Sequence, residues 1–354
     1  MTQMINKVNS VLKLTRASEF KPKNIQWLWQ DWLPRGKLSL LAGPPGTNKT
    51  TVSLNFAAII SNAGCFPDRT QCQESGNVVL WSNEDDIEDT LLPRLIAHGA
   101  NLEKIYFVRA VEDQKTKRPF DPSKDLALLE STIKETGNVH LVILDSAANA
   151  VNGDSHNNGT VRKALQPLVD MANEYNLAVL GILHFNKSTE TSNPLNRIVG
   201  SVGFGSMARL VMVSVIDNDN PDSRLLVRVK SNVGLNGDGF RYSISVKELE
   251  EHPGISSIYI KWDESLKGKP EELLGFDPYK EDKSEGTTLR KAKELITDTL
   301  SKSTNKSFRA SEIETILEEN GISISTIKRA KKDLNIESYK SRDCWYWRLP
   351  STES

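Results

Sequence analysis

A short run of glycine, proline and hydroxyl residues follows an apolar stretch near the amino terminus. It consists of Gly43, Pro44, Pro45, Gly46, Thr47, Asn48, Lys49, Thr50 and Thr51. Loops of this composition bind phosphate, because their backbone N–H groups and the first turn of the next helix point at the anion. Lys49 would reach the β- and γ-phosphates and the Thr50 hydroxyl would bind Mg²⁺, as in a P-loop. The alternative is a turn that merely precedes a lysine-bearing helix.

One position departs from the usual P-loop pattern, which has glycine directly before the lysine. Asn48 stands at that position. Asparagine is the non-glycine residue that best tolerates left-handed backbone angles. We therefore expect the phosphate cradle to form, while the effect of Asn48 on nucleotide affinity or on the rate of hydrolysis stays open.

Three further polar residues follow apolar runs that read as strands. Phosphoryl transfer needs a carboxylate for the Mg²⁺ shell, a group that orients the attacking water, and positive charge. Asp145 follows residues 140–144 and would hold Mg²⁺, Glu84 follows residues 78–82 and would activate water, and His184 would sense the γ-phosphate. The alternatives are a capping role for Asp145, a helix-starting acidic cluster around Glu84, and an interior hydrogen bond for His184.

Apolar runs rich in Val, Ile and Leu alternate with helix-like stretches between residues 37 and 262. This alternation predicts an α/β fold with a mostly parallel, twisted sheet flanked by helices. The expected strands are 37–41, 78–81, 105–108, 141–144, 178–183, 210–215, 225–230, 242–246 and 257–262. The last three leave no room for helices, so they should complete the sheet in antiparallel fashion.

The composition excludes several classes of protein. Of 354 residues 38% are hydrophobic, and 45 Lys and Arg nearly balance 46 Asp and Glu, so any affinity for nucleic acid must be local. The apolar runs are far shorter than the ~18 residues of a membrane span, and three cysteines without a CxxC pair fit a reducing compartment. We expect a cytoplasmic protein without membrane association. Its predicted parts are an arm (1–26), an ATPase core (27–264), a linker (265–288) and a small domain (289–350).

The order of these parts resembles the RecA-like ATPases over about residues 27–262. It is most similar to the branch that contains the plasmid-type RepA hexameric helicase and many phage and mobile-element ATPases, with DnaB, RadA and KaiC as more distant relatives. The resemblance implies ATP as the nucleotide. It also implies that Glu84 is the catalytic glutamate and that His184 couples the nucleotide state to a DNA-contacting loop.

The same resemblance implies a homo-oligomeric ring, a hexamer in that branch. Arg209 would then be an arginine finger for the nucleotide of a neighbouring subunit. Lys230 resembles the lysine of an interface Lys-x-Arg pair, whose second base is replaced here by Asn232. An arginine from a second subunit can raise hydrolysis ~10³-fold or more, although ordinary surface ion pairing is the alternative for both side chains.

Two polar loops, 149–159 and 186–203, match by position the loops that line the channel of RecA-like rings. Lys187 and Arg197 are the obvious basic residues there, and no aromatic side chain is available to stack on bases. Single-stranded DNA in the channel is therefore expected from the resemblance, with little support from the residues themselves.

Three short helices at 289–301, 311–320 and 325–334, followed by a strand pair, predict a C-terminal winged helix-turn-helix. Residues 289–349 hold 13 Lys or Arg against 9 Asp or Glu, and Ser325 would cap the third helix. Duplex DNA should bind the basic residues of that helix and of the wing, which are Lys328, Arg329, Lys332, Lys340 and Arg342. Trp345 and Trp347 should lie in the core. The alternative is a solvated basic face on a domain that binds protein.

These features together predict an ATP-hydrolysing, DNA-associated motor, most similar to a replicative helicase of a plasmid, phage or mobile element. One alternative is a DNA-binding loader or regulator that uses ATP as an assembly switch. Another is a mobile-element or defence ATPase whose C-terminal domain recruits a protein.

Overall fold

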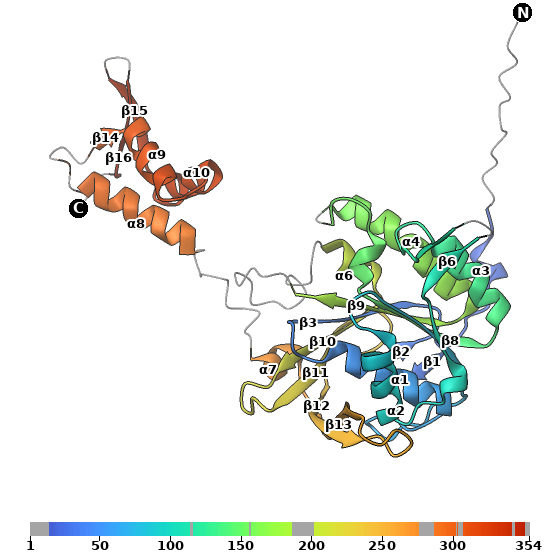
Figure 1. Cartoon of the computed structure of the whole chain (residues 1–354). Helices are drawn as coiled ribbons and strands as arrows, with labels where there is room; N and C mark the ends of the chain where they lie inside the picture. The colour runs from blue at the N-terminus through green and yellow to red at the C-terminus, as the bar shows by residue number, and fades with distance from the viewer. Residues whose placement is uncertain are drawn as a thin grey trace, which may run out of the picture. The chain divides into compact units, whose positions relative to one another are not determined.

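The computed structural model describes residues 14–113, 116–155, 157–185, 202–275, 287–301, 303, 307–341 and 344–350. They form two compact units, each with its own hydrophobic core (Figure 1). The first unit contains the described residues up to 274, and the second contains those from 275 onward.

A nine-stranded sheet lies at the centre of the first unit, in the order β13-β12-β11-β10-β3-β9-β8-β4-β5. Its strands are β3 (Leu38–Gly43), β4 (Asn77–Ser82), β5 (Ile105–Phe107), β8 (Val139–Asp145), β9 (Ala178–His184), β10 (Leu210–Ile216), β11 (Ser223–Ser231), β12 (Gly239–Glu248) and β13 (Ser256–Leu266). The strands from β10 to β5 pair in parallel, and those from β10 to β13 pair in antiparallel fashion. The predicted strands and the antiparallel end of the sheet are thus confirmed. The mixed sheet with helices on its faces fits the predicted α/β fold.

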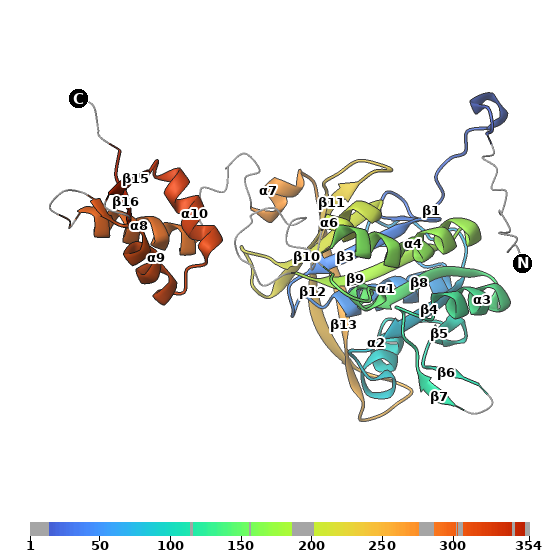
Figure 2. The same cartoon turned by 90° about the horizontal axis from the view of Figure 1, so that it is seen from above.

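Helices cover both faces of this sheet (Figures 1 and 2). One face carries α1 (Lys49–Asn62) and α2 (Leu92–Ala97), and the other carries α3 (Leu126–Thr136), α4 (Asn158–Tyr175) and α6 (Val202–Met207). Because both faces are covered, β3, β8 and β9 are buried along almost their whole length, which explains their uninterrupted apolar sequences. On β9 a Cβ at Gly181 would lie 2.7 Å from the Ala147 Cβ, so the chain after β8 packs directly on this strand.

Short elements fill the connections, and the sequence analysis did not predict them. They are η1 (Ala17–Glu19), β1 (Trp27–Trp29), β2 (Leu33–Pro34), η2 (Ile87–Leu91), η3 (Leu102–Lys104), β6 (Ala110–Glu112), β7 (Lys117–Pro119), η4 (Ala147–Ala150) and α7 (Pro270–Leu274). Strands of two or three residues are too short to show an alternating pattern. The β1–β2 hairpin is nevertheless part of the core, because Trp29 stacks on Trp32 and on Phe66 with ring centroids 4.9 Å apart in each pair.

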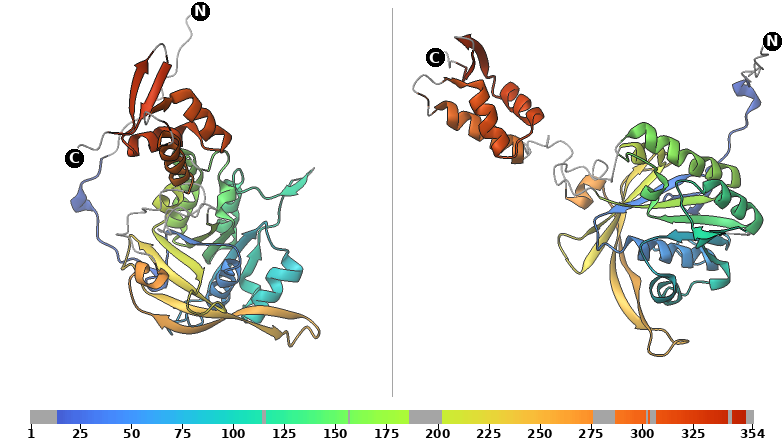
Figure 3. Two further views of the ribbon diagram at one scale, coloured as in Figure 1. Left: turned by 90° about the vertical axis from the view of Figure 1, so that its left-hand side faces the viewer. Right: turned by 45° about the horizontal axis from the view of Figure 1, so that its top comes forward.

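The stretch predicted as a linker, 265–288, begins as ordered structure. Strand β13 continues to Leu266 and α7 follows it, and α8 already begins at Thr287. Figure 3 shows β12 and β13 as a long two-stranded ribbon, coloured yellow to orange, that extends outward from the sheet. In the described part of the chain, no helix has the length and apolarity that a bilayer crossing requires.

The second unit contains three helices and a three-stranded antiparallel sheet. Its elements are α8 (Thr287–Ser301), β14 (Ser307–Arg309), α9 (Ala310–Glu319), α10 (Ile324–Asp333), β15 (Glu337–Ser341) and β16 (Cys344–Arg348), with the strand order β14-β16-β15. Ser323, and not Ser325 as predicted, is the N-cap of α10 and accepts a hydrogen bond from the Thr326 N–H. Trp347 is buried as expected, whereas the prediction for Trp345 was wrong. Trp345 is 57% exposed, because it lies near the tip of the β15–β16 hairpin, where it pairs with Lys340.

His98 joins α2 to the edge strand β13. Its Nε2 accepts a hydrogen bond from the Ile260 N–H at 2.9 Å, and its Nδ1 lies 2.7 Å from the Arg94 carbonyl oxygen. The tautomer that satisfies both contacts carries its proton on Nδ1, so the ring must be neutral. Burial lowers the pKa of His98 to about 4.

We predict that this histidine makes the first unit less stable in acid. Between pH 6.5 and 4, His98 is protonated in the unfolded chain but stays neutral in the folded chain. The free energy of unfolding therefore falls as the pH falls. The loss is about 3 kcal/mol at most. In urea unfolding at pH 7, 5 and 4, His98→Leu should lower stability at pH 7 but remove this part of the pH dependence. A His252→Leu variant, at an exposed position in the β12–β13 loop, should keep it; an unchanged profile for His98→Leu would contradict the assignment.

Candidate nucleotide-binding site

Four parallel strands bring the chemically promising residues to one edge of the sheet. In the order β3-β9-β8-β4, Gly43 pairs with His184, and Asp145 pairs with both Ile182 and Ser82. The P-loop, Asp145 and His184 therefore leave the sheet at the same edge, and Glu84 follows β4 there. Strand β9 lies between the P-loop strand and the Asp145 strand, which the sequence alone does not specify.

The P-loop has the tight backbone that its sequence predicts. Gly46 has a φ of +80°, and a Cβ at Gly43 would lie 2.1 Å from the Ser214 carbonyl oxygen. The Thr47 hydroxyl donates to the Pro44 carbonyl at 3.0 Å, and Lys49 Nζ donates to the same oxygen at 2.9 Å. These two bonds fold the loop back on itself.

Asn48 takes the left-handed conformation expected for it. Its φ is +58° and its ψ is +35°, and it is the N-cap residue of α1 without a hydrogen bond from its side chain. Asn48 thus adopts a left-handed backbone conformation that glycine adopts without a steric penalty. Thr51, two residues after Lys49, is buried in α1.

Lys49 is a buried cation whose Nζ donates, within the described part of the chain, to the neutral Pro44 carbonyl. Lys49 is only 4% exposed, and burial lowers its pKa to about 8. The negative charges of Asp145 and Glu84 act in the opposite direction and raise the pKa by a smaller amount. A buried ammonium group is costly unless it is paired. A phosphate group in the loop would supply the missing negative charge.

Thr50 and Asp145 form a pair that suits a hydrated Mg²⁺. The Thr50 hydroxyl donates to Asp145 Oδ2 at 2.6 Å, and Asp145 Oδ1 is buried with no hydrogen-bond partner among the described residues. Burial, with the charge of Glu84 adding to it, raises the pKa of Asp145 to about 6. A divalent cation would satisfy the unpaired oxygen. Within the described residues no group of three or more His, Cys, Asp or Glu could hold a metal, so phosphate oxygens and water would complete its shell.

Glu84 and His184 face each other beside this pair. His184 Nε2 lies 3.2 and 3.3 Å from the two carboxylate oxygens of Glu84. Both side chains are partly exposed, Glu84 by 44% and His184 by 36%, so water can reach them. The neighbouring acids have other partners: Asp85 pairs with Arg94 at 2.9 Å, and Asp86 caps η2. Glu84 is thus the acid of this cluster that can act as a general base toward water.

Comparison with known proteins decides the family. A family model described as an AAA domain matches residues 8–190, just over half of the chain. The chain belongs to the AAA domain family. Membership of this family makes the chain a nucleotide-binding ATPase. The family implies ATP and a metal ion, typically Mg²⁺.

Other comparisons add little to this assignment. No curated protein matches the chain. Among solved structures, the crystal structure of the RadB recombinase is similar with a TM-score of 0.44 and 18% identity, over 60% of this chain and 89% of that one.

The two cations predicted to act between subunits lie at the opposite edge of the ATPase sheet. The Arg209 N–H donates to the Leu38 carbonyl, at the start of β3, and its side chain is exposed. Lys230 Nζ instead donates to two carbonyls of its own chain, Gly205 at 2.6 Å and Ala208 at 3.0 Å, at the end of α6. Burial, with the charge of Arg209 adding to it, lowers the pKa of Lys230. Of the two, Arg209 presents its charge to the surface.

The residues predicted to bind DNA are only partly described. Lys187, Arg197 and Arg342 lie outside the described residues. The remaining four are exposed in the second unit, Lys328, Arg329 and Lys332 on α10 and Lys340 on β15.

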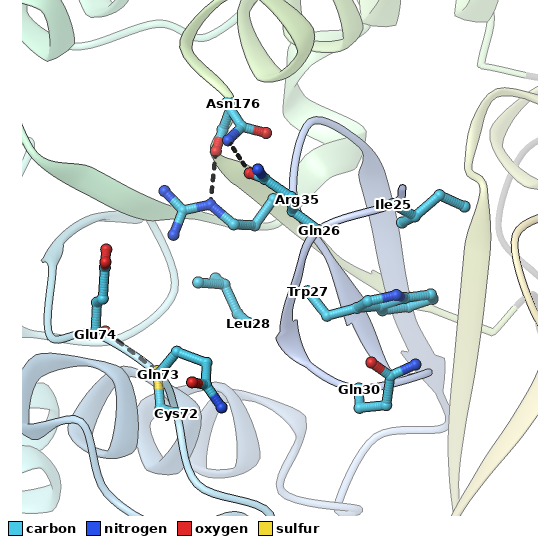
Figure 4. A pocket seen from close by; sticks show the side chains of 10 residues that line it. All are labelled: Ile25, Gln26, Trp27, Leu28, Gln30, Arg35, Cys72, Gln73, Glu74 and Asn176. Carbon is cyan, nitrogen blue, oxygen red and sulfur yellow. Dashed lines mark hydrogen bonds between the residues drawn. The ribbon is translucent and has the colours of Figure 1, made fainter. Parts of the chain in front are cut away.

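Sequence reasoning missed Ser214 and Tyr242, whose hydroxyls contact the P-loop. They lie inside strands of the antiparallel end, and no local sequence pattern distinguishes them from other strand residues. One of the cavities of the ATPase, about 490 Å³ in volume, is not part of this site (Figure 4). It lies beside Arg35 and Asn176, near the amino ends of β3 and β9.

We predict that Glu84→Gln lowers the turnover of ATP by roughly 10²- to 10⁴-fold, because a general base is lost. ATP binding should persist, since Lys49 and the loop are untouched. Asp85→Asn is the matched control and should retain most of the activity. Steady-state phosphate release and equilibrium binding of a fluorescent ATP analogue separate the two effects. Equal turnover for Glu84→Gln and the wild type would rule out the assigned role.

Proposed function

We propose that this AAA-domain ATPase is an oligomeric, ATP-driven motor that acts on DNA, most similar to the RepA-type replicative helicases of plasmids, phages and mobile elements. In this proposal Lys49 binds phosphate, Thr50 and Asp145 bind Mg²⁺, Glu84 activates water, and His184 senses the γ-phosphate. The single observation that carries the assembly is the separation of Arg209 from the nucleotide site of its own chain.

The geometry of β3 explains that separation. Arg209 lies beside the first residue of this six-residue strand, and the P-loop begins at its last residue. A strand of that length spans roughly 17 to 20 Å, which is more than an arginine side chain can cross. If Arg209 acts on a nucleotide, that nucleotide is bound to another copy of the chain. A repeated head-to-tail contact of this kind forms a ring when its rotation closes, and a ring is the assembly that we propose.

The association with DNA is proposed from the second unit. Its order of elements, α8-β14-α9-α10-β15-β16, supports a winged helix in which α9 and α10 form the helix-turn-helix. On α10 the apolar residues Ile327 and Ala330 are buried while Lys328, Arg329 and Lys332 are exposed. Such a basic helix face suits the phosphates of duplex DNA.

Two observations favour a second candidate, an ATP-dependent switch that loads or regulates without unwinding. Asn48 replaces the glycine of the P-loop, and Lys230 is hydrogen-bonded within its own chain while Asn232 replaces the second interface base. The mass of the particle with and without ATP and single-stranded DNA, followed by a duplex-unwinding assay, separates the two. A motor forms a nucleotide-dependent ring that unwinds DNA, whereas a switch assembles without strand separation. A monomer under all conditions contradicts the proposed assembly.

We predict that Lys49→Ala and Arg209→Ala chains are each inactive as ATPases but regain activity when mixed. Half of the mixed sites keep Lys49, and half of these face an intact Arg209, so roughly a quarter of the wild-type rate should return. The exposed Lys261→Ala on β13 serves as a control that stays active alone. Full activity of Arg209→Ala by itself would remove the proposed arginine finger.

We also predict that replacing Lys328, Arg329 and Lys332 together by alanine weakens duplex DNA binding at low salt. The slope of log affinity against log salt should decrease by about 3, because three phosphate contacts are lost. Lys291→Ala, an exposed lysine of α8, is the control for charge alone. If the wild-type chain shows no salt-dependent duplex binding, the second unit recruits a protein instead.

A further inference from the structure

Two buried hydroxyl groups hold the peptide directly before Asn48. The Tyr242 hydroxyl, from β12, donates to the Thr47 carbonyl oxygen at 2.6 Å. Ser214 Oγ, from β10, lies 3.1 Å from the same oxygen and 2.6 Å from the Tyr242 hydroxyl. Both residues are fully buried. Each hydroxyl has one proton to donate. If one hydroxyl donates to the other, the second hydroxyl still has its own proton for the Thr47 carbonyl, so this carbonyl accepts at least one hydrogen bond in either arrangement.

This contact determines where the next N–H group points. A peptide is planar and trans, so the Thr47 carbonyl and the Asn48 N–H point in opposite directions. With the carbonyl fixed toward β10 and β12, the Asn48 N–H is directed away from these strands. Backbone N–H groups of a P-loop are the groups that bind phosphate, so the orientation of this peptide matters for the nucleotide.

The same serine also contacts the beginning of the loop. A Cβ at Gly43 would lie 2.1 Å from the Ser214 carbonyl oxygen, so the two backbones are closely packed. Ser214 thus touches the loop at Gly43 with its backbone and at Thr47 with its side chain. The Tyr242 ring is fixed in turn against Trp262, with ring centroids 5.4 Å apart.

We propose that Tyr242 and Ser214 are positioning residues for ATP, which keep Asn48 in the left-handed conformation that the phosphate cradle requires. Glycine adopts this conformation at little cost, whereas asparagine has a side chain that disfavours it. The two hydroxyls compensate for the missing glycine. This inference rests on ATP binding at the P-loop, which is part of the proposed function. It does not depend on whether the protein acts as a motor on DNA.

The test compares ATP affinity in full-length chains that differ at Tyr242 and Asn48. Tyr242→Phe keeps the ring and removes the shorter of the two hydroxyl contacts to the Thr47 carbonyl, leaving that of Ser214, and it should weaken binding of a fluorescent ATP analogue by about tenfold. Adding Asn48→Gly to this variant should restore the affinity to within about threefold of the wild type, because glycine needs no support in the left-handed region. Ser214→Ala should show the same pattern in weaker form. Tyr259→Phe, on the neighbouring strand β13, is the control for loss of a tyrosine hydroxyl.

Two results would overturn the inference. In the first, Tyr242→Phe binds ATP as tightly as the wild type. In the second, its affinity falls but Asn48→Gly does not restore it, which would show a general loss of stability; thermal unfolding without nucleotide reports that loss directly. A wild-type chain that binds ATP but stays monomeric and does not bind DNA contradicts the proposed motor. In that case, rescue of ATP affinity by Asn48→Gly would still support the positioning role.

Discussion

The burial of two opposite charges at one edge of the sheet is the constraint on which the site depends. Lys49 and Asp145 are 4% and 1% exposed; among the described residues Lys49 Nζ donates only to a neutral carbonyl, and Asp145 Oδ1 has no hydrogen-bond partner. Burial lowers the pKa of Lys49 to about 8 and raises that of Asp145 to about 6. Without a ligand both charges are poorly compensated, whereas a phosphate and a hydrated metal ion would satisfy both. The fold therefore carries a preorganised pair that nucleotide binding stabilises.

The remaining polar groups are arranged around that pair by strand order. Because β8 lies between β9 and β4, the His184 and Glu84 side chains contact each other across the carboxyl end of the strand that carries Asp145. A partly exposed carboxylate and imidazole next to the buried carboxylate of Asp145, the proposed Mg²⁺ ligand, form an arrangement in which water could be held near a phosphate. The charge of Glu84 also contributes to the raised pKa of Asp145, so the acid and the metal ligand influence each other.

The two ends of the parallel strands carry different functional groups. The nucleotide site lies at the carboxyl ends of the parallel strands, and the exposed Arg209 lies at their amino ends. A chain with complementary features on opposite edges is suited to head-to-tail association. The antiparallel strands β10 to β12 serve both edges, since they place Arg209 and Lys230 at one and bring Ser214 and Tyr242 to the P-loop at the other.

Residue types and their spacing in the sequence predicted most of the helices and strands. They also predicted the candidate nucleotide-binding site within one chain. The P-loop composition, the apolar runs and the polar residues after them identify Lys49, Asp145, Glu84 and His184, because parallel strands bring their carboxyl ends to one edge whatever their order. The left-handed Asn48 could also be foreseen, since asparagine is the non-glycine residue that best tolerates this backbone region.

Only the tertiary structure decided which residues support the loop and which are available to a partner. Tyr242 lies almost 200 residues after Thr47, and the contact depends on the pairing register of β10 to β12, which a sequence pattern of period two does not fix. The exposure of Trp345 was decided in the same way, by its place near the tip of the β15–β16 hairpin. Periodicity specifies the face on which a side chain lies, but what covers that face depends on packing with distant elements.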